Sequence, residues 1–107
     1  MGTLNVDDYD GHQIRTIAME DQTVWYVTAD VCRCLDIAIN NRTGKPNVTV
    51  ATRQISDQDK QKYRIETPEN PKNPWIDMMI VSKQGMMLML EELDLTIAEP
   101  FKSQIIK

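Results

Sequence analysis

The spacing of apolar residues changes abruptly at Ser82. Residues 75–81 are almost all apolar, which is typical of a buried β-strand. Apolar residues then recur at helical spacing, so a helix is predicted over residues 83–93 with Ser82 as its N-cap. The apolar stripe of this helix consists of Met86, Met87, Leu90 and Leu93. Three acidic residues near its predicted end oppose the helix dipole: Glu91, Glu92 and Asp94.

A β-hairpin followed by a second helix is predicted nearer the N-terminus. Residues 13–19 alternate polar and apolar side chains, and residues 24–27 are strong β-formers beyond a short polar turn. Thr28 is the predicted N-cap of the helix, and Asp30 lies in the first turn, where a carboxylate faces the positive end of the helix dipole. The helix is expected to end near residues 36–37. Its apolar face consists of Val31, Cys34 and Leu35.

The middle of the chain has weaker patterns. The composition of residues 40–46 indicates a loop. Asn47 could cap a short helix over residues 48–55, but the β-branched residues there are equally compatible with a strand, and both alternatives stay open. Residues 63–65 are compatible with a brief strand. Three prolines in residues 67–74 predict a loop.

These segments predict an α+β fold, a small antiparallel sheet with several short helices. Because proline is tolerated in a first turn, Pro100 is expected to start a last helix over residues 101–107. A chain of 107 residues can bury one hydrophobic core but not two. We therefore expect a single domain over residues 1–107.

Three local features carry expectations about packing. One of the two rings at Trp25 and Tyr26 is expected to join the core, where the hairpin meets the helix. Gly85 costs its helix about 1 kcal/mol relative to alanine, so a close neighbouring backbone is expected there. Most of the methionines clustered over residues 78–89 are expected in the core, although methionine-rich surfaces can also bind partners.

Catalytic and metal-binding chemistry is not indicated. A nucleophile usually needs a nearby histidine, and the one histidine, His12, falls in a predicted polar turn before the first strand. Cys32 and Cys34 are too close for a disulfide in regular structure, and a zinc site would need about four ligands. The four glycines are too far apart for a phosphate loop. We therefore expect no enzymatic activity, no cofactor and no bound metal.

Charge is distributed unevenly along the chain, whose formal net charge is −4. Residues 42–64 carry six basic residues against two acidic ones, whereas residues 1–41 and 65–107 are both acidic. The six residues form what we call the basic island: Arg42, Lys45, Arg53, Lys60, Lys62 and Arg64. Such residues could neutralise phosphates, and the alternative is a solvated face. No apolar run approaches the ~20 residues of a membrane span, and no secretory signal is visible.

Three motifs stand in a characteristic order. Residues 24–37 read VWYVTADVCRCLDI, an aromatic strand end followed by an Asp-Val helix start. Residues 80–89 read IVSKQGMMLM, a strand followed by a Ser-x-x-Gly-hydrophobic helix, and residues 98–102 read AEPFK. Together they resemble the Bro-N domain, the N-terminal module of baculovirus Bro proteins and many phage antirepressors, over a core of about residues 13–105. Asp36 departs from that pattern, because the family usually has glycine there.

The resemblance implies a Bro-N-like fold and a viral or prophage regulatory role in the cytoplasm of the host cell. Our first hypothesis is DNA binding, or antirepressor-type transcriptional regulation, with phosphate contacts made by the basic island. Our second is an acidic inhibitor that binds a repressor or a host defence complex, as an anti-CRISPR-type antagonist would. No membrane association is expected. The DNA site, the protein partner and a homodimeric state are left open.

Overall fold

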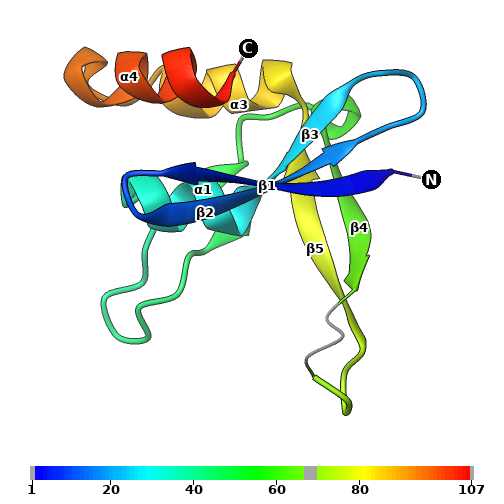
Figure 1. The fold of residues 1–107 in the computed structure, drawn as a ribbon. Helices are drawn as coiled ribbons and strands as arrows, with labels where there is room; N and C mark the ends of the chain where they lie inside the picture. The colour runs from blue at the N-terminus through cyan, green and yellow to red at the C-terminus, as the bar shows by residue number, and fades with distance from the viewer. Residues whose placement is uncertain (1, 67–69, 107) are drawn as a thin grey trace.

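The computed structural model describes residues 2–66 and 70–106, which form the sheet and helices of Figure 1. The strands are β1 (Thr3–Tyr9), β2 (His12–Ala18), β3 (Val24–Val27), β4 (Lys60–Glu66) and β5 (Trp75–Val81). The helices are α1 (Thr28–Leu35), α2 (Val48–Ala51), α3 (Lys83–Leu90) and α4 (Leu95–Ile105), and a short 3-10 helix, Asp57–Asp59, precedes β4. The predicted α+β fold with an antiparallel sheet is confirmed.

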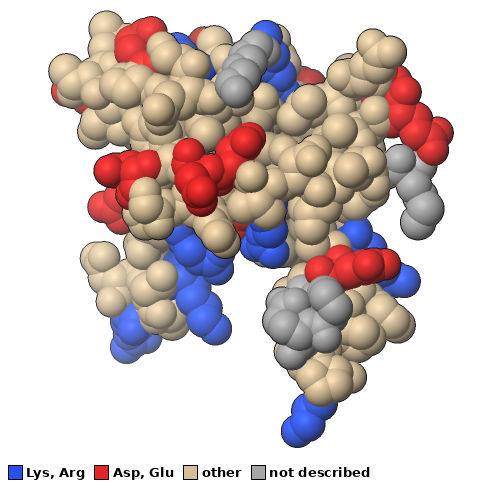
Figure 2. All heavy atoms as spheres, viewed as in Figure 1, with Lys and Arg blue, Asp and Glu red and all other residues tan. Residues whose placement is uncertain are grey.

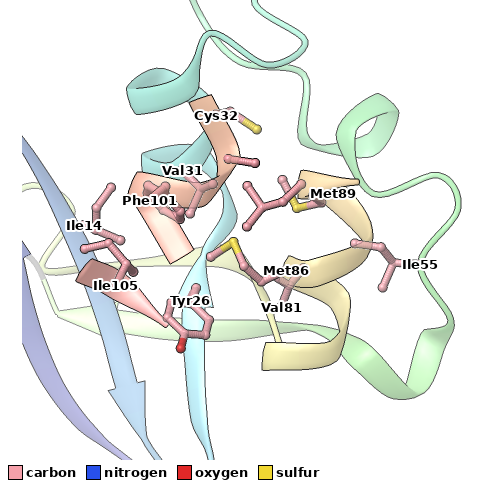
Figure 3. Packing of buried hydrophobic residues seen from close by; sticks show 12 residues of the cluster. Ile14, Tyr26, Val31, Cys32, Ile55, Val81, Met86, Met89, Phe101 and Ile105 are labelled. Atoms are coloured by element: carbon pink, nitrogen blue, oxygen red, sulfur yellow. The ribbon is translucent and has the colours of Figure 1, made fainter. Parts of the chain in front are cut away.

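The strands lie in the order β1-β2-β3-β5-β4, and all neighbours are antiparallel. Successive side chains along a strand point to opposite sides of a sheet, so each side carries its own hydrophobic cluster. On one side Ile14, Tyr26 and Val81 pack against α1, α3 and α4 in the larger cluster (Figure 3). Residues from these helices that complete it include Val31, Cys32, Met86, Met89, Leu90, Ala98, Phe101 and Ile105.

A smaller cluster fills the opposite side of the sheet. Its buried residues are Ile17, Val27, Ile65 and Ile80, with Trp25, Tyr63 and two methionines packed around them. The β1–β2 and β4–β5 hairpins run in different directions in Figure 1. They are tied together near this cluster, because the backbone N–H of Gly2 donates a hydrogen bond of 2.9 Å to the Tyr63 hydroxyl. The sheet thus buries apolar residues on both sides.

The predicted hairpin, the strand at Trp75–Val81 and the cap at Ser82 are confirmed. Strands β2 and β3 pair in antiparallel register, and the Ser82 hydroxyl accepts a 3.1 Å hydrogen bond from the backbone N–H of Gly85. At Asn47 the helical alternative holds: its side chain accepts from Val50 N–H at 3.2 Å, although α2 is only one turn long. The brief strand predicted at residues 63–65 lies within the longer β4. In the predicted loop over residues 67–74, residues 67–69 lie outside the described part of the chain.

Strand β1 is an element that the apolar pattern did not predict. Its side chains are almost all exposed, so its composition carries no core signal. The sequence does contain a hairpin signal, the pair Asp10-Gly11, which adopts φ values of 50° and 82° as a type I′ turn requires. His12 is corrected as well: it is the first residue of β2, and β1 comes before it.

Helix α1 begins differently from the prediction but ends where predicted. The N-cap is Val27 rather than Thr28, because β3 continues directly into the helix. The buried hydroxyl of Thr28 has no hydrogen-bond partner among the described residues. At the C-terminal end Asp36 adopts the left-handed conformation, with φ 56° and ψ 46°. Asp36 therefore caps the helix in the conformation that glycine would favour.

The last two helices divide differently from the prediction. Helix α3 ends at Leu90 rather than at residue 93, so Asp94 belongs to the next helix. Asp94 is the N-cap of α4, and its carboxylate accepts a 2.8 Å hydrogen bond from Thr96 N–H. Pro100 therefore lies inside α4 instead of starting a helix, and the carbonyl of Thr96 loses the bond that residue 100 would otherwise donate. Lys107 lies outside the described residues.

Candidate nucleic-acid interface

The basic island is divided among three parts of the fold. Arg42 and Lys45 lie on the loop between α1 and α2, where a bridge between Ile39 and Pro46 closes the base of the loop. Arg53 follows α2. The remaining three residues, Lys60, Lys62 and Arg64, lie on the edge strand β4. The brief strand predicted at residues 63–65 included only Arg64 among them.

The three basic residues of β4 share one side of the sheet. They alternate along the strand, and the register pairs Lys60 with Val81 and Val81 with Tyr26. Tyr26 and Val81 belong to the larger cluster, so Lys60, Lys62 and Arg64 point to the side of the sheet that carries the helices. The α1–α2 loop extends from the helical layer on this same side.

Figure 2 shows the outcome on the surface. Most of the blue side chains in this view lie on its lower half, over the α1–α2 loop and the β4–β5 hairpin, and a few lie at the top. These two segments project from the molecule, and the surface between them is hollowed. Red side chains gather mainly above and to the left, over the β1–β2 hairpin and the helices. On the face seen in Figure 2, the uneven charge of the sequence therefore becomes a partial separation of positive from negative side chains.

Two members of the island already have partners within the chain. The Lys60 ammonium donates a 3.0 Å hydrogen bond to the carbonyl of Thr52, which joins β4 to the end of α2. The Arg64 guanidinium lies 3.6 Å from an Asp77 carboxylate oxygen and 5.1 Å from the centroid of the Trp75 ring. Both Trp75 and Arg64 are largely exposed, so this stack is displayed on the hairpin rather than buried. Lys60 is thus mainly structural, and Arg64 is held in place.

The other four residues of the island are exposed: Arg42, Lys45, Arg53 and Lys62. Among the described residues, none of these four side chains forms an ion pair. Exposed cations without an ion pair can contact an anionic ligand without first breaking an internal salt bridge.

Arg33 is a basic residue that sequence reasoning did not include. It lies on α1, its side chain is 49% exposed, and its guanidinium is 3.5 Å from a carboxylate oxygen of Asp30. Asp30 is only 7% exposed and also accepts hydrogen bonds from the backbone N–H and the guanidinium of Arg15, at 2.8–3.0 Å. The signal was the position of Arg33 on the polar side of the predicted helix. When charges are counted by chain segment, Arg33 falls within residues 1–41, whose net charge is negative.

The surface also contains a hollow of about 1090 Å³ away from the basic island, between β1, β3 and α3. Its lining mixes apolar and polar side chains, among them Val6, Val24, Trp25, Asp59, Lys83 and Met87. No residue of the basic island lines it.

Both cysteine thiols have raised pKa values. Burial raises the pKa of the Cys32 thiol to about 11, and burial together with the charge of Asp10 raises the pKa of Cys34. Both thiols are therefore protonated near neutral pH, which makes them poor nucleophiles. No three His, Cys, Asp or Glu side chains of residues 2–66 and 70–106 are grouped as a metal site. None of the helices described is both long and apolar enough to cross a membrane.

These features define a small α+β domain that displays charge on a projecting loop and hairpin. The BRO family N-terminal domain, Bro-N, matches residues 13–107, and the chain belongs to this family. This confirms the resemblance carried by the three motifs. No curated protein and no solved structure matches the chain. Strand β1 precedes the matched residues.

Proposed function

We propose that this Bro-N domain binds double-stranded DNA through the basic island and acts as a viral or prophage regulatory domain. The observation that supports the proposal is the shared orientation of its cations. Three basic residues of β4 face the same side as the α1–α2 loop, and four of the six island residues are exposed without an ion pair in the described chain. In this proposal the domain binds DNA and catalyses no reaction.

The two projections have complementary parts in this function. The β4–β5 hairpin is a two-stranded ribbon, an element of a size that the major groove of B-DNA admits. The cations of the α1–α2 loop then contact phosphates, as Arg53 does beside α2. Arg33 lengthens the basic surface toward α1. Phosphate contacts position a protein on the duplex but do not specify sequence, so the proposal concerns affinity and orientation only.

The test measures binding of a fluorescent duplex by anisotropy over a range of salt concentrations. If about five phosphates are neutralised, log affinity falls against log salt with a slope of about −4 to −5. The double variant Arg53→Gln/Lys62→Gln should lower affinity by about tenfold or more and reduce the slope by about 2, because two phosphate contacts are lost. Lys60 is left unchanged, since its bond to Thr52 is structural.

The control variant is Lys83→Gln/Lys102→Gln, which removes the same charge from α3 and α4, outside the island. It should bind nearly as the unmodified chain does. Equal weakening by both variants would indicate a general charge effect. A duplex affinity that does not change with salt concentration, or no binding at low salt, would reject the proposal.

The second candidate is an acidic antagonist of a repressor or host defence protein. It is favoured by the acidic surface around the β1–β2 hairpin in Figure 2, where Asp7, Asp8 and Asp10 lie. An acidic surface can steer a protein toward a basic groove. Replacing these three residues with Asn should abolish binding to a purified partner and leave duplex binding intact. Binding to the partner that survives the triple replacement would exclude this alternative.

A further inference from the structure

Strand β1 forms one end of the sheet, and its outer edge is not paired with any strand of the described chain. It is seven residues long and pairs with β2 along its whole length. Leu4 and Val6 are 43% and 53% exposed. An edge strand that pairs regularly along its length, with exposed apolar residues and no proline, is a template for another strand. The opposite edge, β4, instead carries three residues of the basic island, Lys60, Lys62 and Arg64.

The turn between β1 and β2 determines which backbone groups face outward. Because Asp10 and Gly11 form a two-residue type I′ turn, the flanking pair Tyr9 and His12 exchanges backbone hydrogen bonds. Bonded and non-bonded pairs alternate along an antiparallel ladder, so every second residue of β1 bonds to β2. The N–H and C=O groups of the residues between them point away from the sheet. These residues are Leu4, Val6 and Asp8.

The outward groups form a self-complementary set with Val6 at the centre. If a second copy pairs antiparallel about Val6, Val6 faces Val6, and Leu4 faces Asp8 of the other copy. In the positions between, Asn5 faces Asp7. No carboxylate lies directly opposite another, and the exposed valines meet in the middle. A register centred on Asp8 would place the two Asp8 carboxylates opposite each other, which is destabilising.

We propose that β1 is a homodimerisation strand, which joins two copies of this chain through antiparallel β1–β1 pairing centred on Val6. The partner that fits is a second copy, because the register that matches all outward backbone groups also separates the acidic side chains. Leu4 pairs with the buried Ile17 of β2, so the joined edge continues next to the smaller cluster. Strand β1 precedes the residues that match the family, so this pairing is a property of this chain's own strand. The pairing is also independent of the proposed DNA binding, because no residue of the basic island lies on β1.

The first experiment is sedimentation equilibrium of the full chain at concentrations up to about 1 mM. A reversible monomer–dimer equilibrium is expected, and a monomer throughout this range would overturn the proposal. Val6→Pro should weaken the dimer by at least tenfold, because proline removes the central outward N–H. That N–H makes no bond to β2, so circular dichroism should show the fold retained.

A second pair of variants tests the register. Val6→Lys and Val6→Glu should each be monomeric, because like charges then face each other at the centre. An equimolar mixture of the two should dimerise, because Lys faces Glu. The controls are Val6→Thr, which keeps a β-branched residue and its N–H, and Ile97→Lys, which charges an apolar α4 residue that is 46% exposed. Both should dimerise as the unmodified chain does. A dimer that survives Val6→Pro and Val6→Lys, or a mixture that stays monomeric, would refute β1 pairing about Val6.

Discussion

Gly85 lies where helix α3 closely approaches the backbone of another segment. A Cβ atom at this position would lie 2.9 Å from the backbone carbonyl oxygen of Asp59 and 3.1 Å from a side-chain carbon of Ile55. The close backbone neighbour predicted from the helix cost of glycine is therefore present. The same Asp59 carbonyl accepts from Ser82 N–H, and its carboxylate accepts from the Ser82 hydroxyl. Gly85 thus allows the segment before β4 to pack directly on the start of α3.

We expect Gly85→Ala to destabilise the protein by about 1–3 kcal/mol, because a backbone carbonyl must shift to admit the methyl group. This is the net change, after the gain of about 1 kcal/mol that alanine brings to a helix. Urea denaturation followed by circular dichroism measures the difference. Gln84→Ala, at the exposed neighbouring position of α3, should change stability by less than about 0.5 kcal/mol. A Gly85→Ala protein as stable as the unmodified chain would contradict the steric argument.

Asp30 shows where residue-level reasoning stops. Its place in the first turn of α1 was predictable, because a carboxylate is favourable at a helix N-terminus. Its partner Arg15 was not predictable, because Arg15 lies on strand β2 and reaches Asp30 only when β2 packs beside α1. A dipole argument uses neighbours in sequence, whereas a buried ion pair depends on neighbours in space.

At the scale of elements, capping residues determine where α3 and α4 begin. Ser82 and Asp94 each accept a hydrogen bond from an N–H in the first turn of their helix. The sequence predicts Asp94 near the end of one helix, where its charge opposes the helix dipole. In the structure Asp94 is the N-cap of the next helix, where a negative charge is favourable.

The cap at Asp94 predicts a pH-dependent stability. Hydrogen bonds from the N–H and hydroxyl of Thr96 hold the pKa of the Asp94 carboxyl below its ordinary value of 3.8. A lowered folded-state pKa contributes stability above the unfolded-state value and loses it as pH falls through the folded-state pKa. Asp94→Ala should therefore melt at a lower temperature than the unmodified chain at pH 7, and this gap should narrow below about pH 4.

Asp94→Asn separates the hydrogen bond from the charge. Asparagine keeps an acceptor oxygen for the first turn, so its stability at pH 7 should lie between those of Asp94→Ala and the unmodified chain. Thermal melts at pH 7 and pH 3 compare all three proteins. A gap between Asp94→Ala and the unmodified chain that stays constant down to pH 3 would show that the carboxylate charge does not contribute.

At the scale of the whole molecule, the sheet connects the two hydrophobic clusters. Adjacent residues of β3 belong to different clusters, Tyr26 to the larger and Val27 to the smaller. The same holds for Val81 and Ile80 of β5. Neither cluster can lose these strands without the other, so the two sides of the sheet should unfold together.

We therefore expect Ile65→Ala, in the smaller cluster, to destabilise the helices on the opposite side as much as its own side. Truncating a buried isoleucine should cost about 2–5 kcal/mol. Far-UV circular dichroism follows the helices, and tryptophan fluorescence follows Trp25 beside the smaller cluster when both proteins also carry Trp75→Phe, which removes the exposed second tryptophan. The two urea transitions should coincide in both proteins. A fluorescence transition that moves while the helical transition stays would show that the clusters unfold independently.

The sequence alone determined those features that depend on residues close together in the chain. The fold class, the β2–β3 hairpin, the strand before Ser82 and the cap at Ser82 follow from local spacing, and so does the existence of a basic island. Three ordered motifs identified the family, which the match over residues 13–107 confirmed. The local spacing of apolar residues did not predict β1, because an exposed edge strand needs no apolar alternation.

Only the tertiary structure decided how the parts meet. It placed the basic residues of β4 on the helical side of the sheet and assigned Lys60 to a structural contact. It also brought Arg15 of β2 to the carboxylate of Asp30, and it left the outer edge of β1 unpaired among the described residues. The physical reason is that strand register and helix packing bring together residues far apart in sequence. Charge, exposure and ion pairing depend on those contacts, and the order of residues along the chain does not encode them locally.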